Sequence, residues 1–474
     1  MNYELVVGLE THVELLTKTK IFCSCKNSFG DEPNTNCCPV CIGLPGTLPK
    51  LNREVVNFAI KAGLALNCTI NLNSRMDRKN YVYPDLSKAY QISQFYSPIC
   101  TNGYLELSSG KKIRIHQIHM EEDAGKLVHK AGDVYVDYNR GGVPLLEIVT
   151  EPDISSSEEA REYIEKLQMI MRYIGVSDCK MQEGSMRCDV NVSIRPAGSR
   201  TFGTRTEIKN MNSVTFMTKA IDYEFKRHIA IIESGEKVVQ QTLRYIEETN
   251  STQSMRSKED AQDYRYFPDP DLVNVSLEKS YVNRIQDELP ELPESRFKKY
   301  TEVFGIPEND AMLIVKYKNV SDFFEQSSIN LKNPKMISNF IIGQIFRNIE
   351  TESDREKFDI LTTPNQLNKL AILIEEGKLN MNLAKKTLTK MLETGKGIEE
   401  FVSESDMKGL SDEEIEKLCD DAIKSNESAV KDYLDGKEKA LKAILGFVMR
   451  QTRGKGDPLK IEQKIIEKIN CLFV

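Results

Sequence analysis

The stretch LVVGLETHVEL, residues 5–15, alternates apolar and polar side chains along its length. Successive side chains of a β-strand point to opposite faces, so the odd-numbered residues would share one face and Glu10, His12 and Glu14 the other. The first face suits a hydrophobic core, whereas the second carries carboxylates and an imidazole. We therefore predict a strand with one buried face and one polar, acidic face.

Two later segments, residues 186–195 and 205–209, repeat this pattern. In any single strand, an ordinary solvent-facing sheet would show the same alternation. Three strands with carboxylates beside amide, imidazole or cationic groups favour a sheet with a chemically active face. The polar positions of the later strands include Arg187, Asp189, Asn191, Ser193, Arg195, Arg205, Glu207 and Lys209.

Two further segments place carboxylates where they need partners. The run MEEDAGK, residues 120–126, brings Glu121 and Glu122 to an expected strand end, and PLLEIVT, residues 144–150, sets Glu147 among apolar residues. Because a buried unpaired charge is costly, a metal ion or a cationic neighbour is the simplest compensation. Oxygen ligands with at most one imidazole suit Mg²⁺, which commonly joins carboxylates to substrate phosphates.

The sequence lacks the common glycine-rich phosphate-binding motifs: G-x-x-x-x-G-K-[ST] is absent, and no G-x-G-x-x-G follows an expected strand. Any nucleotide phosphates would therefore be held by a metal ion and by Lys or Arg side chains. The candidate segments are 78–81 and 140–142, although a surface turn would show the same residues.

Five of the eleven cysteines lie between residues 23 and 41. Cys23-x-Cys25 followed by Cys38-x-x-Cys41 is typical of two knuckles that supply four thiolates to a zinc ion. Four thiolates leave no open coordination position, so such a zinc would be structural. Cys37 could replace Cys38, and the alternative is a loop of reduced, metal-free thiols.

Length and composition indicate a multidomain globular protein. The chain has 474 residues, 40% hydrophobic and 28% charged, with a net charge of −7. At roughly 150 residues per domain this length predicts about three domains, and the composition is ordinary for a globular chain. No apolar stretch approaches the roughly 18 residues of a membrane-spanning helix, and the first residues lack a signal segment. We expect a cytoplasmic protein without membrane contact.

The chain changes character at LPELP, residues 289–293, where two prolines disfavour a helix and mark a boundary. Helical periodicity dominates beyond it. Residues 399–436 hold thirteen acidic and four basic side chains, whereas residues 437–474 hold nine basic and four acidic ones. The basic segment favours a localised anionic partner, although a solvated surface helix would look the same. We predict domains at 1–290, 291–400 and 401–474.

Eight segments together resemble the B subunits of the glutamine-dependent aspartyl/glutamyl-tRNA amidotransferases, and the similarity spans essentially the whole chain. Several of the matching motifs run beyond ten residues. The segments are ELVVGLETHVE (4–14), PNTNCCPVCIGLP (33–45), RKNYVYPDLSKAYQIS (78–93), IHMEEDAG (118–125), DYNRGGVPLLEIVTEPD (137–153), RCDVNVSI (187–194), TEIKNMN (206–212) and MRSKEDAQDYRYFPDPD (255–271).

The resemblance implies an α+β fold. Residues 1–290 would form an antiparallel-sheet catalytic cradle like that of glutamine synthetase and guanido kinases, with the cysteine knuckle inserted at 23–41. An all-helical domain and a helical GatB/YqeY-like tail that binds tRNA would follow. The resemblance also implies a heterotrimer, in which the glutaminase subunit GatA releases ammonia and the small subunit GatC stabilises the complex. This chain would use ATP and Mg²⁺ to phosphorylate the side-chain carboxylate of Glu-tRNA(Gln) or Asp-tRNA(Asn), and ammonia would displace the phosphate.

Roles for individual residues follow from the resemblance together with the strand pattern. Lys79, Arg140 and Lys209 would neutralise phosphates, and Asp189 or Glu147 could alternatively take a proton from the attacking ammonium. His116 and His119 are expected to be hydrogen-bonded structural residues. The expected sets are Glu147, Asp189 and Lys209 for catalysis; Lys79, Arg140 and Asn191 for the cofactor; Glu10, His12, Glu121, Glu122, Glu147 and Glu207 for magnesium, with Asp189 beside them; and Cys23, Cys25, Cys38 and Cys41 for zinc.

Two other functions fit parts of the sequence. An amide ligase acting on a free amino acid, as glutamine synthetase does, would share the metal chemistry but would have no use for the basic tail. A tRNA-binding scaffold without catalysis would explain the tail but not the clustered carboxylates. The amidotransferase subunit accounts for both features.

Overall fold

The structure, a computed structural model, describes residues 2–257, 263–403, 412–435, 437–451 and 458–472. The chain forms two compact units, Met1–Leu292 and Pro293–Val474. The break lies inside the proline-marked segment LPELP. The further division expected at residue 400 stays a prediction, and residues 404–411, 436, 452–457 and 473–474 of the expected tail domain lie outside the described residues.

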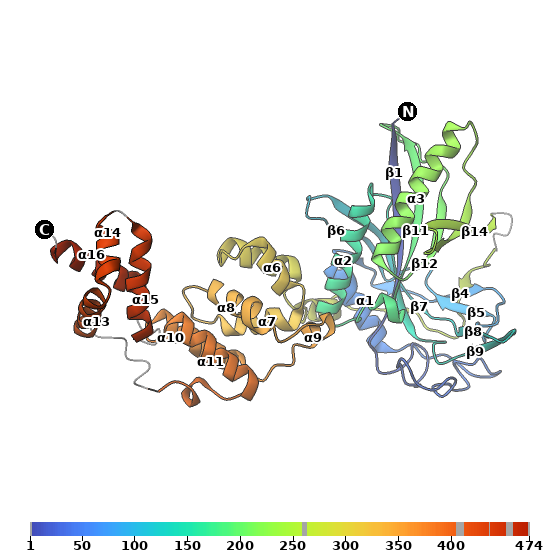
Figure 1. Cartoon of the computed structure of the whole chain (residues 1–474). Helices are drawn as coiled ribbons and strands as arrows, with labels where there is room; N and C mark the ends of the chain where they lie inside the picture. The colour runs from blue at the N-terminus through green and yellow to red at the C-terminus, as the bar shows by residue number, and fades with distance from the viewer. Residues whose placement is uncertain (1, 258–262, 404–411, 436, 452–457, 473–474) are drawn as a thin grey trace. The chain divides into compact units, whose positions relative to one another are not determined.

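A nine-stranded sheet forms the centre of the first unit (Figure 1). The strand order is β14-β13-β12-β11-β1-β10-β7-β6-β2, and neighbouring strands are antiparallel except for the parallel pair β12 and β13. The long polar-faced strand expected from the sequence is β1, and it lies centrally between β10 and β11. The strands are β1 (Tyr3–Glu14), β2 (Thr69–Ile70), β6 (Cys100–Glu106), β7 (Lys112–Glu122), β10 (Pro144–Thr150), β11 (Met186–Pro196), β12 (Thr206–Met211), β13 (Gln241–Ile246) and β14 (Ser251–Ser257).

Three smaller sheets accompany the large one. The sheet β15-β4-β5 matters most for the site, because β5 packs beside β7. The others are the pair β16-β3 and the hairpin β8-β9. Their strands are β3 (Asn73–Ser74), β4 (Asp77–Asn80), β5 (Tyr90–Ser93), β8 (Lys126–Lys130), β9 (Asp133–Asp137), β15 (Phe267–Pro268) and β16 (Val275–Ser276).

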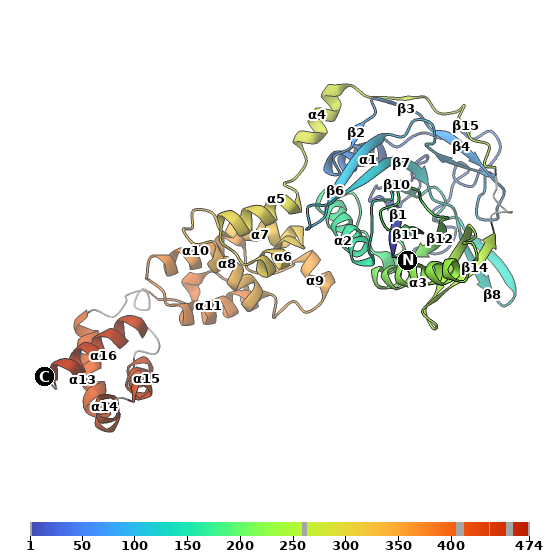
Figure 2. The same ribbon diagram turned by 90° about the horizontal axis from the view of Figure 1, so that it is seen from above.

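Helices cover the apolar face of the large sheet. Val7, Leu9 and Val13 of β1 share one buried core with apolar residues of the first three helices, as the strand alternation requires. Figure 2 shows α2 and α3 side by side along this face. The opposite face of the central strands is thereby left to polar side chains. The helices are α1 (Arg53–Ala65), α2 (Ser157–Tyr173), the 3-10 turn η1 (Met181–Glu183), α3 (Val214–Glu233) and α4 (Lys279–Asp287).

In the described residues of the second unit, every regular element is a helix, and loops connect these helices. A buried cluster running from Ile415 to Ile469 forms a core of its own among its last helices. The α+β class is confirmed at the level of a mainly antiparallel sheet followed by helices, while the likeness to glutamine synthetase and guanido kinases stays a prediction. The helices are α5 (Pro293–Lys298), η3 (Lys299–Val303), α6 (Glu308–Val315), α7 (Lys318–Ser327), α8 (Lys335–Phe340), η4 (Ile341–Ile345), α9 (Glu352–Lys357), α10 (Pro364–Glu375), α11 (Met381–Thr394), η5 (Ile398–Glu400), α13 (Asp412–Ser425), α14 (Glu427–Leu434), η6 (Glu438–Ala440), α15 (Leu441–Gln451) and α16 (Pro458–Leu472).

Within the described part of the chain, every helix is too short or too polar to cross a lipid bilayer.

Candidate functional site

Strand register gathers the expected site residues on the polar face of the large sheet. Glu10 lies opposite Asp189 of β11, and His12 lies opposite Glu147 of β10. Glu147 in turn lies opposite His119 of β7. Because paired residues in adjacent strands point to the same side, four strands contribute to one polar surface.

The first cluster consists of His12, Glu121 and Glu147, whose ligand atoms all lie within 4.8 Å of one another. The Nε2 atom of His12 lies 3.5 Å from Oε1 of Glu121 and 3.6 Å from Oε2 of Glu147. Glu121 is buried, and the amide of Gln91 in β5 donates to its Oε2 atom at 3.2 Å. One imidazole and two carboxylates from three strands therefore converge on one point.

His119 of β7 contacts the first cluster through Glu147. Its Nε2 atom lies 3.0 Å from Oε2 of Glu147, and its ring is buried. Burial opposes the charge on Glu147, but the neighbouring His119 and His12 outweigh it and lower the pKa of Glu147. Burial and the charge of Glu147 raise the pKa of Glu121. The pair thus favours an ionised Glu147 beside a more readily protonated Glu121.

The second cluster consists of Glu10, Asp189 and Glu207, again within 4.8 Å of one another. The ammonium group of Lys209 lies 2.6 Å from Asp189 and 2.5 Å from Glu207, so it offsets part of their charge. Burial and the charge of Glu147 raise the pKa of Glu10, which couples the two clusters electrostatically. The sequence assigned Lys209 to phosphates, and the structure places it on the carboxylates.

The donor atoms of both clusters fit a hard divalent cation. Carboxylate oxygens with at most one imidazole are the ligand set of Mg²⁺ and Mn²⁺. Glu10 and His12 are two residues apart on one face of β1, a spacing of roughly 7 Å along a strand. The two clusters are therefore neighbours on a single strand rather than separate sites.

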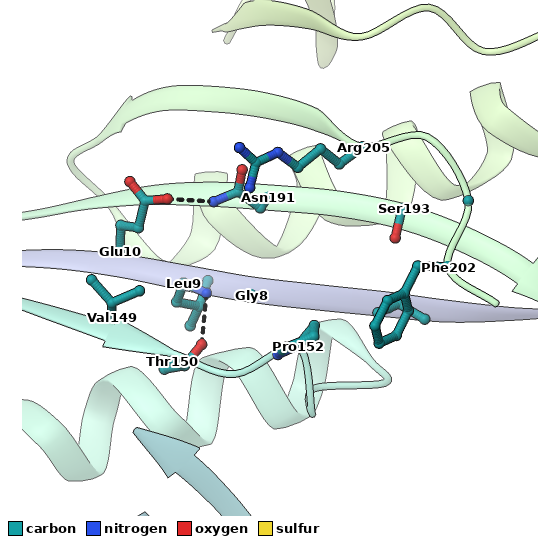
Figure 3. Close-up of a pocket in the computed structure, with 12 residues that line it drawn as sticks. Gly8, Leu9, Glu10, Val149, Thr150, Pro152, Asn191, Ser193, Phe202 and Arg205 are labelled. Carbon is teal, nitrogen blue, oxygen red and sulfur yellow. Dashed lines mark hydrogen bonds between the residues drawn. The ribbon is translucent and has the colours of Figure 1, made fainter. Parts of the chain in front are cut away.

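A pocket opens beside the second cluster, with Glu10, Asn191 and Arg205 on its lining (Figure 3). Its volume is about 270 Å³. The amide of Asn191 donates to Oε1 of Glu10 at 2.9 Å, and Figure 3 shows the Arg205 side chain extending toward this pair. Gly203 is required on the wall, because a Cβ atom there would lie 2.2 Å from the carbonyl oxygen of Ile194. The rest of the lining is Val6, Gly8, Leu9, Val149, Thr150, Pro152, Ser193 and Phe202.

Two expected residues, Glu122 and Arg140, lie away from the clusters. Glu122 points away from Glu121, as neighbours in a strand must, and its carboxylate accepts hydrogen bonds from Lys88 and from the backbone N–H of Ile92. The structure therefore does not bring Glu122 to either cluster. Arg140 donates to the carbonyl oxygens of residues 124 and 125, which ties it to a loop.

Lys79 lies at the edge of the first cluster. Its ammonium group sits 4.6 Å from the ring centroid of Tyr264, and its charge helps to lower the pKa of Glu147 after the larger effects of the two histidines. Lys79 also pairs across strands with Gln91, which contacts Glu121. Of the expected phosphate-binding cations, Lys79 is therefore the one beside the first cluster.

The four expected zinc ligands also converge. Cys23, Cys25, Cys38 and Cys41 lie with their Sγ atoms within 4.8 Å of one another, an arrangement that could hold zinc. Cys37 lies outside this group, with its Sγ atom 3.8 Å from Oδ1 of Asn139. The alternative ligand at that corner is thus disfavoured.

The structure adds detail for His119 and Arg205. His119 was expected to be a hydrogen-bonded structural residue, and its buried ring lies 3.0 Å from the carboxylate of Glu147 in the first cluster. Gln117, His119 and Glu121 alternate along β7, and the register of β7 against β10 shows that they lie on the face that carries the cluster. Arg205 belonged to a recognised polar face, but only the fold shows that it lines a pocket with Glu10.

Comparisons with known proteins match nearly the whole chain. Residues 5–283 match the family model described as the GatB/GatE catalytic domain, and residues 322–469 match the GatB domain. The B subunits of aspartyl/glutamyl-tRNA(Asn/Gln) amidotransferases from several bacteria are similar throughout. The protein from Thermoanaerobacter pseudethanolicus is 49% identical over 99% of this chain and its own full length. The one from Ruminiclostridium cellulolyticum is 48% identical over 100% of this chain and 98% of its own, and the one from Clostridium tetani is 47% identical over the full length of both.

Proposed function

The chain belongs to the family of B subunits of the aspartyl/glutamyl-tRNA(Asn/Gln) amidotransferases, and from this premise we propose how its polar sheet face works. As a subunit of this ligase, the chain takes part in forming Gln-tRNA(Gln) or Asn-tRNA(Asn). The polar face activates the side-chain carboxylate of the misacylated amino acid. The full-length similarity and the converging carboxylates support this assignment.

Activation is needed because a carboxylate is a poor electrophile. Phosphorylation by ATP gives it a better leaving group, and phosphoryl transfer depends on positioning and on cations at the phosphates rather than on covalent help from the protein. Mg²⁺ ions held by the two clusters would supply that charge. Arg205 on the pocket lining would orient the nucleotide, Lys209 would offset the charge of Asp189 and Glu207, and Lys79 would neutralise charge at the first cluster.

The observation that carries this proposal is the position of Glu10 and His12 on one face of β1. Each residue belongs to a different cluster, so two cation sites would share one strand. A nucleotide bound at the pocket beside Glu10 would reach an amino-acid carboxylate at the His12 cluster. A shared strand fixes the spacing between donor and acceptor, as an in-line transfer requires.

The partners belong to the same proposal. The glutaminase subunit GatA supplies ammonia, GatC stabilises the heterotrimer, and the reaction takes place in the cytoplasm. The basic helices of the tail domain contact the tRNA backbone, which supplies most non-specific nucleic-acid affinity. Reduced thiols at Cys23 and Cys41 agree with structural zinc in this setting.

Glu147→Gln in the reconstituted heterotrimer tests the proposal. The change removes the ionised carboxylate of the first cluster while keeping its shape, so folding should persist and glutamate-dependent ATP turnover should be lost. Glu151→Gln is the control, because Glu151 pairs with the exposed His116 outside the clusters. Normal ATP turnover in Glu147→Gln would refute the proposal, and a scaffold without catalysis would show no such turnover in any variant.

A variant of the tail tests whether the substrate is an aminoacyl-tRNA or a free amino acid. Deleting residues 437–474 would remove Ile444 and Ile465 from the tail core, so charge reversal is the cleaner change. Lys439 and Lys442 are exposed, and Lys439→Glu with Lys442→Glu should raise the KM for misacylated tRNA with little effect on kcat. An unchanged KM in the double variant would favour a free amino-acid substrate.

A further inference from the structure

Five aromatic rings form a continuous series beside the first cluster. Tyr264 lies 5.7 Å from Tyr81 and 6.1 Å from Tyr266, measured between ring centroids. Tyr266 stacks on Phe95 at 4.2 Å with the planes 12° apart, and Phe95 meets Tyr96 edge-on at 5.1 Å. These five residues, Tyr81, Phe95, Tyr96, Tyr264 and Tyr266, are here named the aromatic strip.

The outer end of the aromatic strip is exposed yet firmly held. Phe95 and Tyr96 are each 54% exposed. Their backbone N–H groups both donate to Oδ2 of the buried Asp77, at 2.8 and 3.0 Å, and the Tyr96 hydroxyl donates to the carbonyl oxygen of Tyr266. A buried carboxylate thus fixes the turn that presents two large apolar rings to solvent. Rings held in this way form a preorganised binding surface.

The inner end of the strip reaches the first cluster. Lys79 and Gln91 are cross-strand partners in β4 and β5. Gln91 donates to Glu121, while the Lys79 ammonium lies 4.6 Å from the Tyr264 ring and 5.7 Å from the Tyr81 ring. The strip therefore runs from the carboxylates of the first cluster to the protein surface.

The strip and the pocket lie on different sides of the site. The pocket is lined by β1, β10 and β11, on the side of the Glu10 cluster. The strip lies next to the β15-β4-β5 sheet, on residues just after β4 and β5 and just before β15, and β5 packs on β7 beyond the His12 cluster. The two surfaces can therefore hold different parts of the reacting molecules.

We propose that the aromatic strip binds the single-stranded 3′ end of the aminoacyl-tRNA by stacking its terminal bases, while the esterified amino acid extends to the His12 cluster. This inference rests on the proposed function, which places the amino acid at that cluster. Unpaired bases bind proteins largely by stacking on aromatic side chains. Lys79 near the inner rings provides positive charge for the backbone phosphates, and Arg75, 5.1 Å from the Tyr96 ring, adds to it although it pairs with Asp77 at 3.3 Å.

Stacking has a direct readout that needs no catalysis. 2-Aminopurine in place of the 3′-terminal adenine of a misacylated tRNA should lose fluorescence when the base stacks on the strip in the heterotrimer. Phe95→Leu keeps an apolar side chain but removes the ring, so the quenching should be largely lost. Phe29→Leu is the matched control, because Phe29 is another exposed phenylalanine and lies in the cysteine knuckle.

Kinetics identify which substrate the strip serves. Stacking of one base contributes about 1–3 kcal/mol, so Phe95→Leu should raise the KM for misacylated tRNA by about 5- to 150-fold and leave the KM for ATP unchanged. The control Phe29→Leu lies outside the strip and should retain both values. In Glu147→Gln, loss of ATP turnover with retained quenching would support both proposals, whereas retained ATP turnover with retained quenching would overturn only the proposed function.

Three outcomes would overturn the assignment of the strip. The first is that the Phe95→Leu heterotrimer quenches 2-aminopurine fluorescence as strongly as the unaltered heterotrimer does. The second is a rise in the KM for ATP rather than for tRNA, which would make the strip part of the nucleotide site. The third is dissociation of the Phe95→Leu heterotrimer on gel filtration, while the part that stays assembled binds tRNA as the unaltered protein does. That result would make the strip a contact between subunits.

Discussion

The ammonium group of Lys20 lies 3.7 Å from the Sγ atom of Cys41. Lys20 is fully buried, and among the described residues the only other hydrogen bond of its ammonium group is to the carbonyl oxygen of Tyr138, at 3.1 Å. A buried ammonium group needs an anionic partner. The hydrogen bond from Cys23 is the main cause that lowers the pKa of Cys41, and Lys20 acts in the same direction. Lys20 thus favours the thiolate that a zinc ion requires.

Lys20→Met should weaken zinc retention. The substitution keeps an unbranched side chain of similar length but removes the charge that compensates four thiolates. Loss of a group that supports a metal ligand typically lowers metal affinity by about 10- to 100-fold. Zinc release to a chromophoric chelator should therefore be faster in the variant. Lys26→Met is the control in the same knuckle, because Lys26 is exposed and pairs only with Asp31 among the described residues, and equal release from both variants would contradict the role of Lys20.

Glu121→Gln and Glu122→Gln should affect different properties, Mn²⁺ binding and stability respectively, although the residues are adjacent. Glu121 belongs to the first cluster, so its replacement should weaken Mn²⁺ binding with little change in melting temperature. Glu122 pairs with Lys88, so its replacement leaves a mostly buried cation without its partner charge and should lower stability by about 1–3 kcal/mol. Titration calorimetry with Mn²⁺ and thermal unfolding measure the two effects. Equal loss of Mn²⁺ binding in both variants would contradict the assignment of Glu121 to the metal cluster and of Glu122 to a stabilising ion pair.

The same pair shows what sequence can and cannot predict. The period of two fixes that Glu10 and His12 share a face, and the spacing of the cysteines predicts their convergence. The sequence does not show which of Glu121 and Glu122 faces the cluster, because that depends on the register of β7 against β10. Both faces of β7 carry acidic residues at its end, so side-chain type gives no further information.

Contacts between distant segments could not be predicted from the sequence, because they depend on which strands pair. Lys209 bridges Asp189 and Glu207 only because β11 and β12 pair in one register. The aromatic strip combines residues near 81 and 95 with residues 264–266, whose side chains meet only after β15 pairs with β4. The domain boundary was easier, because two prolines act locally on the backbone.

Glu224→Gln should destabilise the first unit and flatten its acid unfolding profile. Glu224 of α3 is fully buried, and its carboxylate accepts hydrogen bonds from Thr206, Arg227 and Thr252. Burial alone would raise the pKa of Glu224, but hydrogen bonds from His228, Arg227 and Thr252 lower it to about 2. Thr206 is adjacent to Glu207, so this network also anchors the strand that carries part of the second cluster.

The sign of the pH effect follows from the lowered pKa. Between the ordinary value of 4.5 and about 2, the unfolded chain binds a proton at Glu224 that the folded chain does not, so stability rises with pH in this window. The contribution is complete above pH 4.5, at about 3 kcal/mol or less, and is lost as the pH falls through 2. Denaturant unfolding of Glu224→Gln and of the exposed control Glu233→Gln across pH 2–7 measures it. A steep acid limb that persists in Glu224→Gln would contradict this origin.

A fragment ending at residue 292 should fold by itself, whereas one ending at residue 278 should not. The hydrophobic core of the first unit includes Val282 and Ile285 of α4, both of which are buried. Leu289 and Leu292 pack against the same core, so the unit is complete only at its last residue. Removing α4 would expose the two buried side chains, each worth about 1.5–3 kcal/mol of burial. Cooperative thermal unfolding of fragment 1–292 and its absence in fragment 1–278 would support the boundary. Cooperative unfolding of both fragments with equal midpoints would show that α4 adds nothing to the core.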